Sequence, residues 1–260
     1  MNDVLFAFLL TLFAGLATGI GGAVVLFTRQ NNMKFLSLAL GFSAGVMVFI
    51  SFVEIFDKAK ESLEYEYGEG SGFLFASIAF FVGVALTAMI DKLLPHHEDK
   101  EGHDGAEIDV KPLERTGIMS ALAITLHNFP EGFVTFMAAM HDPALGVVIA
   151  AAIAIHNIPE GIAISAPIYY ATGSKKKAIL LSFGSGLTEP LGALAAYFLL
   201  YQVLSEGLFG IIFAGVGGMM VFISFHQLLP AAHKYGEHHH IMKSLFAGMI
   251  VMAISLVVLH

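Results

Sequence analysis

Long apolar runs decide what this chain can fold into. Eight stretches of about 20 residues or more are almost free of charge, and short polar segments separate them. A helix needs about 20 apolar residues to cross a bilayer, and in lipid only helices and closed barrels satisfy their own backbone. We therefore predict an all-α integral membrane protein with eight transmembrane helices. The predicted spans are residues 3–27, 35–57, 71–94, 117–140, 144–168, 177–203, 208–230 and 241–259.

Composition supports this class and narrows the function. The 260 residues are 57% hydrophobic and 13% charged, whereas soluble domains carry about 25% charged residues. The chain has no cysteine, which excludes disulfides and thiolate metal ligands. It has no ATP-binding P-loop sequence. We expect a single transmembrane domain over residues 1–260, with a His- and acid-rich cytoplasmic loop at 95–116, surrounded by membrane lipid and without a nucleic acid partner.

The basic residues predict an orientation. With the N-terminus outside, all 13 Lys and Arg residues except Lys58 and Lys60 fall on the inner face. The positive-inside rule then favours a multi-pass protein of the cell membrane with both termini outside. The outer segment after the second span is expected to be a solvated acidic loop. Its acids are Asp57, Glu61, Glu64, Glu66 and Glu69.

An internal repeat relates the two ends of the chain. "GVMVFISFVE" at 45–54 matches "GMMVFISFHQ" at 218–227, and "GLATGIGG" at 15–22 aligns with "GLTEPLGA" at 186–193. The first and second spans therefore resemble the sixth and seventh. A shift of five spans is odd, so the second copy is inverted in the membrane, as in many transporters. We predict a three-two-three arrangement, in which helices 1–3 and 6–8 surround central helices 4 and 5.

The two central spans carry a duplicated polar motif near the bilayer midplane. The copies are "HNFPEG" at 127–132 and "HNIPEG" at 156–161. In each copy the His, Asn and Glu share one helical face. The proline obstructs the carbonyl four residues back, at Leu126 or Ile155, and such a carbonyl is tolerated in a membrane only inside protein or beside a polar cavity. The glycine that ends each motif permits close approach of another helix.

Unpaired carboxylates point to a cation. The spans contain Glu54, Glu131, Glu160 and Glu189, and no Lys or Arg is expected well inside them. Each ionised carboxylate at the centre costs at least about 2.5–3.5 kcal/mol, so three cost on the order of 10 kcal/mol. Imidazole with carboxylate and amide oxygens suits borderline divalent ions, and two motifs suit two adjacent ions. A purely structural reading, with His and Asn as interhelical hydrogen-bond partners at a kink, explains the duplication less well.

The paired motifs, with the acidic "GLTEPLGA", resemble the ZIP (Zrt/Irt-like) metal-transporter family, and its bacterial branch in particular, over essentially the whole chain. The resemblance implies the three-two-three inverted-repeat fold and a binuclear metal site. One metal position would use His127, Glu131, His156 and Glu160. The other would use Asn128, Glu131, Asn157, Glu160 and Glu189.

The resemblance and the repeat also indicate a metal path. Met47 resembles a second-helix residue near the first metal position. Gln227 stands where the family often has an acid, so His226 is expected to take more of that role. Glu54 aligns with Gln227 in the repeat, which makes these two residues way-stations at opposite mouths of the path.

Histidines outside the spans fall into two tracts. The first is His96, His97 and His103, and the second is His233 and His238 to His240. Neither tract has the spacing of a structural zinc site. A flexible acceptor for arriving ions and a plain solvated loop both remain open for each.

The expected function is uptake of divalent transition-metal ions from outside into the cytoplasm. Zinc is the leading substrate, with iron, manganese, cobalt and cadmium open, and no cofactor is expected beyond two such ions. The repeat units would move relative to the metal-bearing pair, and protonation of Glu131 and Glu160 would ease release. Two rivals remain: an intramembrane metalloenzyme of the di-metal carboxylate type and a non-transporting metal sensor. A homodimer is also open.

Overall fold

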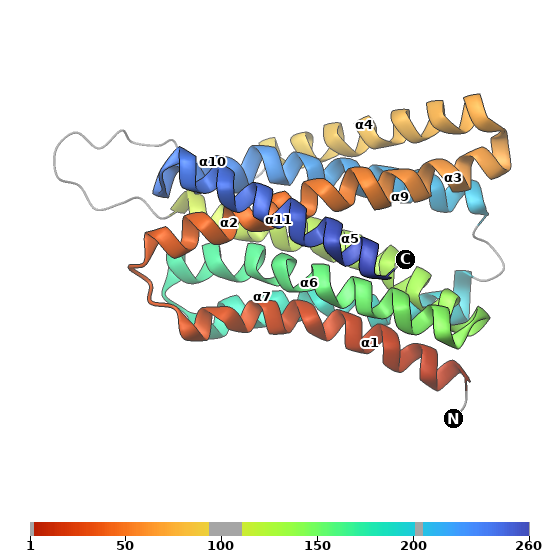
Figure 1. Cartoon of the computed structure of the whole chain (residues 1–260), viewed down its shortest axis with the longest axis horizontal. Helices are drawn as coiled ribbons and strands as arrows, with labels where there is room; N and C mark the ends of the chain where they lie inside the picture. The colour runs from red at the N-terminus through yellow and green to blue at the C-terminus, as the bar shows by residue number, and fades with distance from the viewer. Residues whose placement is uncertain (1–2, 94–110, 201–204, 260) are drawn as a thin grey trace.

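The computed structural model describes residues 3–93, 111–200 and 205–259, and these ranges are helical with short connections (Figure 1). This confirms the all-α prediction for the described residues. The α-helices are α1 (Asp3–Gly22), α2 (Met33–Ile50), α3 (Phe56–Tyr67), α4 (Glu69–Leu93), α5 (Lys111–His141), α6 (Pro143–Thr172), α7 (Lys175–Gly186), α8 (Thr188–Ala195), α9 (Glu206–Ile223), α10 (Leu229–Tyr235) and α11 (His238–Leu259). A 3₁₀ turn follows α1 at Ala23–Phe27, and π-helical turns lie at Ser51–Ile55, Ala196–Leu200 and Ser224–Leu228.

Seven helical stretches of the described chain are long and apolar enough to cross a membrane. They are Asp3–Phe27, Met33–Tyr67, Glu69–Leu93, Pro143–Thr172, Lys175–Phe198, Glu206–Tyr235 and His238–Val257. Each contains most of one predicted span. The remaining predicted span, residues 117–140, lies within α5, whose polar motif and charged first turns lower its hydropathy. At 31 residues α5 is still long enough to cross.

The predicted acidic loop after the second span is wrong, because this segment forms α3 and the start of α4. The π-helical turn Ser51–Ile55 continues α2 into α3, which packs against α4 and α9. Ala59 and Leu63 are four residues apart, so they share one face, and both are buried. The chain turns only at Gly68, whose φ of 84° favours glycine. The charged residues of α3 end the apolar run of the second span, but the helix continues through them to Tyr67.

Other predicted boundaries also shift. α5 begins at Lys111, so the end of the predicted loop 95–116 is helical. His96, His97 and His103 lie outside the described residues. His238 begins α11 instead of ending a loop.

Pro130 and Pro159 lie inside continuous α5 and α6, whereas the sixth predicted span is divided at Leu187 between α7 and α8. The break in the sixth span therefore precedes Glu189 and Pro190.

The repeated segments have matching local structure. Ser51 and Ser224 begin equivalent π-helical turns, one after α2 and one after α9. The Ser51 hydroxyl donates to the Met47 carbonyl at 2.6 Å, and the Ser224 hydroxyl donates to the Met220 carbonyl at 2.8 Å. In Figure 1 α2 and α9 run in opposite directions along the bundle.

Glycines set the spacing between the central helices and their neighbours. A Cβ atom at Gly21 of α1 would overlap the Ile158 carbonyl of α6, and one at Gly192 of α8 would overlap the Phe129 carbonyl of α5. The same offsets that align the sequence repeats relate these two contacts. α5 and α6 also pack extensively on each other, so the four helices enclose the duplicated motifs.

Candidate metal site

Three buried side chains from α5 and α6 meet at the centre of the bundle. Glu131 lies one turn after His127 on α5, and its Oε2 is 3.4 Å from His127 Nε2. Its other oxygen, Oε1, is 2.7 Å from Nε2 of His156 on α6. One ligand atom of each residue lies within 4.8 Å of the other two, a separation that one metal ion can bridge. Glu131 therefore joins the two motifs.

Glu160 and Glu189 add two carboxylates to this centre. Oε1 of Glu160 is 3.9 Å from His127 Nε2. Glu189 projects from the first turn of α8, and its Oε1 accepts a hydrogen bond from Asn157 Nδ2 at 2.5 Å. Both glutamates are fully buried.

The two asparagines make equivalent contacts with the repeated units. Asn128 Nδ2 donates to the Ser185 carbonyl of α7 at 3.2 Å, and Asn157 Nδ2 donates to the Ala14 carbonyl of α1 at 2.9 Å. Ser185 and Ala14 are aligned by the repeat. These hydrogen bonds fix the orientation of each amide. Neither amide oxygen, Oδ1 of Asn128 or Oδ1 of Asn157, has a hydrogen-bond partner within the described residues.

Many polar atoms of these residues have no hydrogen-bond partner within the described part of the chain. Buried polar groups are usually satisfied, so a concentration of unsatisfied oxygens and nitrogens needs an explanation. Their lone pairs are those that a divalent transition-metal ion prefers. The atoms are His127 Nδ1 and Nε2, Asn128 Oδ1, Glu131 Oε2, His156 Nδ1, Asn157 Oδ1, Glu160 Oε1 and Oε2, and Glu189 Oε2.

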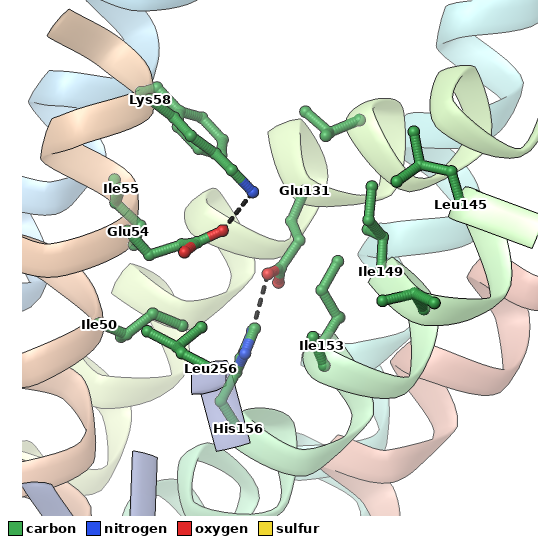
Figure 2. Close-up of a pocket in the computed structure, with 14 residues that line it drawn as sticks. Ile50, Glu54, Ile55, Lys58, Glu131, Leu145, Ile149, Ile153, His156 and Leu256 are labelled. Carbon is green, nitrogen blue, oxygen red and sulfur yellow. Dashed lines mark hydrogen bonds and ion pairs between the residues drawn. The ribbon is translucent and has the colours of Figure 1, made fainter. Parts of the chain in front are cut away.

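A cavity of about 250 Å³ reaches this centre from the end of the bundle that holds both termini. Figure 2 shows two pairs on the wall of this cavity, Glu131 bonded to His156 and Lys58 paired with Glu54. Apolar side chains such as Ile149 line the wall between them. Glu54 and Glu131 therefore line the same cavity, and the place of Glu54 on a metal path stays a prediction. Lys58 was not predicted to line this cavity, because its place in a presumed loop hid its position one helical turn after Glu54.

A second polar cluster lies around Asp91, in the last turn of α4. Gln227 Nε2 donates to Asp91 Oδ1 at 2.6 Å, and His226 Nε2 is 3.3 Å from Asp91 Oδ2. Nη2 of Arg115, on α5, lies 2.8 Å from Asp91 Oδ1. Thr116 Oγ1 lies 3.4 Å from Gln227 Oε1.

Asp91 is missing from the sequence prediction although it is buried and lies inside the predicted span 71–94. The sequence did offer a signal for Asp91, since it is a carboxylate near the end of the otherwise apolar third span. Arg115 was assigned to a loop, yet it lies in α5 beside that carboxylate.

Met47 is fully buried in the apolar core on α2. Among the described residues it is not one of those that line the cavity at Glu131. A nearby residue of α2, Ser43, donates its hydroxyl to the Pro159 carbonyl at 2.8 Å. On α8, Thr188 donates to the Thr125 carbonyl at 3.1 Å. Hydroxyls thus bond to the backbone near each proline. The carbonyls that they contact are not those of Leu126 and Ile155, which were predicted to need a partner.

Comparisons with known proteins identify relatives of the whole chain. A sequence model of the ZIP zinc transporter family matches residues 94–256. Proteins named zinc transporter ZupT align over nearly their whole length. The one from Lysinibacillus sphaericus is 55% identical over 99% of both chains, and the one from Chlorobaculum parvum is 53% identical over 98% of both chains. The one from Clostridium perfringens is 50% identical over 98% of this chain and 96% of its own.

Proposed function

Because this chain belongs to the ZIP family of zinc transporters, we propose that it carries divalent transition-metal ions into the cytoplasm through a binuclear site on α5, α6 and α8. Zinc is the proposed principal substrate, since the relatives are named for it. The same oxygen and imidazole ligands suit iron, manganese, cobalt and cadmium. The family is one of transporters and not of enzymes, so the metalloenzyme alternative is not retained.

The observation that carries this proposal is the meeting of His127, Glu131 and His156 in a buried position. No Lys or Arg in the described ranges is ion-paired with Glu131, Glu160 or Glu189. A cation from solution would supply the compensating charge. Imidazole and carboxylate ligands bind Zn²⁺ at about 2.0–2.2 Å, so modest side-chain movement would close the triad around one ion.

The second proposed metal position lies toward α8. Its ligands would be Asn128, Glu131, Asn157, Glu160 and Glu189. Asn157 and Glu189 already lie in contact, and the amide oxygens of both asparagines have no hydrogen-bond partner within the described residues. Glu131 and Glu160 would bridge the two ions.

We further propose the three-two-three inverted repeat, with α5 and α6 as the central pair and α5 as the eighth span. Three matched features support it: the π-helical turns at Ser51 and Ser224, the asparagine contacts and the glycine contacts. The backbones of α1 and α6 are in close contact, as are those of α8 and α5. We therefore infer that these four helices move together and carry the metal between the two faces, which revises the expectation that the whole repeat units move relative to α5 and α6.

The proposed orientation places both termini outside in the cell membrane. Basic residues of the described chain gather at the opposite end of the bundle, which would then face the cytoplasm. With the inside negative, an entering divalent ion gains about 4.6 kcal/mol per 100 mV. Uptake then requires no ATP. Protonation of Glu131 and Glu160 would help to release the ion on the inside.

Proteoliposomes that enclose a metal-sensitive dye test this function. The intact protein is expected to admit zinc at a rate that rises with an inside-negative potential. Glu131→Ala and Glu160→Ala should abolish uptake, whereas Glu114→Ala, which removes a surface ion pair with Lys177, should retain it. Undiminished uptake by both site variants contradicts the site, and no uptake of any divalent ion by the intact protein contradicts transport.

A further inference from the structure

Two imidazole rings face each other at the turn between α10 and α11. His233 lies near the end of α10 and His238 begins α11, and both are exposed. His233 Nε2 and His238 Nδ1 are 2.8 Å apart, and the ring centroids are 5.0 Å apart. In Figure 1 α10 lies at the end of the bundle opposite both termini. None of the residues of the buried centre contributes to this pair.

The backbone fixes which nitrogen of His233 is available. Its Nδ1 lies 2.8 Å from the Leu229 carbonyl oxygen, one helical turn earlier. A carbonyl only accepts hydrogen bonds, so Nδ1 of His233 carries a proton, and in the neutral ring Nε2 holds a lone pair that accepts the Nδ1–H of His238. For both facing nitrogens to bind one ion, the His238 proton moves from Nδ1 to Nε2 of the same ring. Metal-binding histidines commonly have this arrangement, in which a carbonyl orients the ring through its other nitrogen.

The spacing of the pair is close to that of two ligands on one ion. With Zn–N distances of about 2.0–2.1 Å, two nitrogens of a tetrahedral site stand about 3.3 Å apart. The two rings therefore need to separate by only about half an ångström to admit an ion between them. Glu237 and His240, whose side chains are 3.1 Å apart, lie next to and two residues after His238 in the chain and are candidates for further ligands. Water can complete the coordination.

We propose that His233 and His238 form a binding site for one divalent transition-metal ion, of the zinc, cobalt, nickel or copper type. The ligand chemistry selects these ions over Ca²⁺ and Mg²⁺, which prefer oxygen. His226, which contacts Asp91, precedes His233 by seven residues, or about 10 Å of helix. The pair therefore lies just beyond the Asp91 cluster. Its role as the acceptor of ions that leave the membrane rests on the proposed function and its orientation.

Site-specific carbethoxylation tests the binding directly. The purified full chain is treated with diethyl pyrocarbonate at increasing Zn²⁺ concentration, and mass spectrometry follows each histidine separately. Zn²⁺ is expected to slow the modification of His233 and His238 at least tenfold, with the same concentration dependence, and Ca²⁺ is expected to have no effect. His239, exposed and adjacent in sequence, serves as the internal control.

The matched variants are His238→Ala and His239→Ala. Loss of His238 should shift protection of His233 to at least tenfold higher Zn²⁺, and loss of His239 should leave it unchanged. Zinc-independent modification of both rings overturns the proposal, as does unchanged protection of His233 in His238→Ala. Because the measurement requires no transport, failed uptake in proteoliposomes leaves this binding site standing and removes only its role as an acceptor.

Discussion

Thr18 and Glu189 occupy equivalent positions in two matching contacts. The Thr18 carbonyl oxygen lies against Gly161 of α6, and the Glu189 carbonyl oxygen lies against Gly132 of α5. Both residues are fully buried. Their side chains differ, however, because Glu189 binds Asn157 through a carboxylate while Thr18 offers a neutral hydroxyl. The centre is therefore asymmetric by one carboxyl group, despite the matching contacts of the helices around it.

This asymmetry predicts that Glu189→Thr removes one of two bound metal ions. The variant places threonine at both of these equivalent positions and deletes a carboxylate of the proposed second metal position. The His127–Glu131–His156 triad is unchanged. Metal analysis after equilibrium dialysis should fall from about two ions per chain to about one. The control, Thr18→Val, should keep two. Equal stoichiometry in Glu189→Thr and the unmodified protein would reject the second position.

The glycine contacts predict that Gly161→Ala destabilises the protein. A Cβ atom at Gly161 would overlap the backbone of α1 at Thr18, which cannot move as a flexible side chain can. Overpacking of this kind costs about 1–3 kcal/mol, so the thermal unfolding midpoint in detergent should fall. Gly184→Ala is the control, since no atom lies within 4 Å of its Cβ position, and its midpoint should hold or rise. Equal midpoints for the two variants would contradict close packing of α1 on α6.

Lys58 is predicted to weaken the capture of cations at the mouth of the cavity. Its ammonium group pairs with Glu54 and lines the same cavity as Glu131. Lys58→Ala makes this region more negative and should lower the KM for zinc uptake by about twofold to fivefold at low ionic strength. The difference should shrink in high salt.

The matched variant for Lys58 is Lys60→Ala. Lys60 pairs with Asp57 and is not among the described residues that line the cavity. Its KM should not change. The opposite change at the mouth, Glu54→Gln, should raise the KM. A rise in KM for Lys58→Ala would show that the ammonium group assists entry.

The cluster at Asp91 is predicted to stabilise the fold at the C-terminal end of α4. Asp91→Ala removes the carboxylate that pairs with Arg115 and accepts from Gln227. Breaking a buried ion pair costs about 3–5 kcal/mol, and less is expected here because the Arg115 side chain is 23% exposed. The unfolding midpoint should fall clearly. Glu114→Ala removes an exposed pair, worth about 0–1 kcal/mol, and should barely change it; a similar effect of both substitutions would place Asp91 among ordinary surface charges.

Sequence alone anticipated the elements whose signal is local. The apolar runs mark the helices, and the duplicated motif places His127, Glu131 and His156 on faces that do meet. The spacing within each motif was sufficient, because residues four apart on a helix share a face wherever that helix packs. The repeat likewise anticipated the matched local structure of α2 and α9.

Features that depend on packing between distant segments were not predictable in this way. α3 is polar overall and becomes recognisable as helix only through the burial of Ala59 and Leu63 against its neighbours. Asp91 is part of a polar cluster only because it contacts Gln227, which lies far from it in the sequence. Lys58 was taken for a loop residue, and its place in the cavity follows from the uninterrupted passage of α2 into α3. In each case the missing information was a contact between distant segments. The spacing of apolar residues along the sequence does not reveal such contacts.

The paired π-helical turns at Ser51 and Ser224 record an order of events in the history of this chain. A π turn arises when one residue is inserted into an α-helix, and its appearance at the same point in both repeats requires either two separate insertions or one inherited insertion. The surrounding "MVFISF", identical in both copies, favours inheritance. We infer that one ancestral segment already carried this turn before it was duplicated.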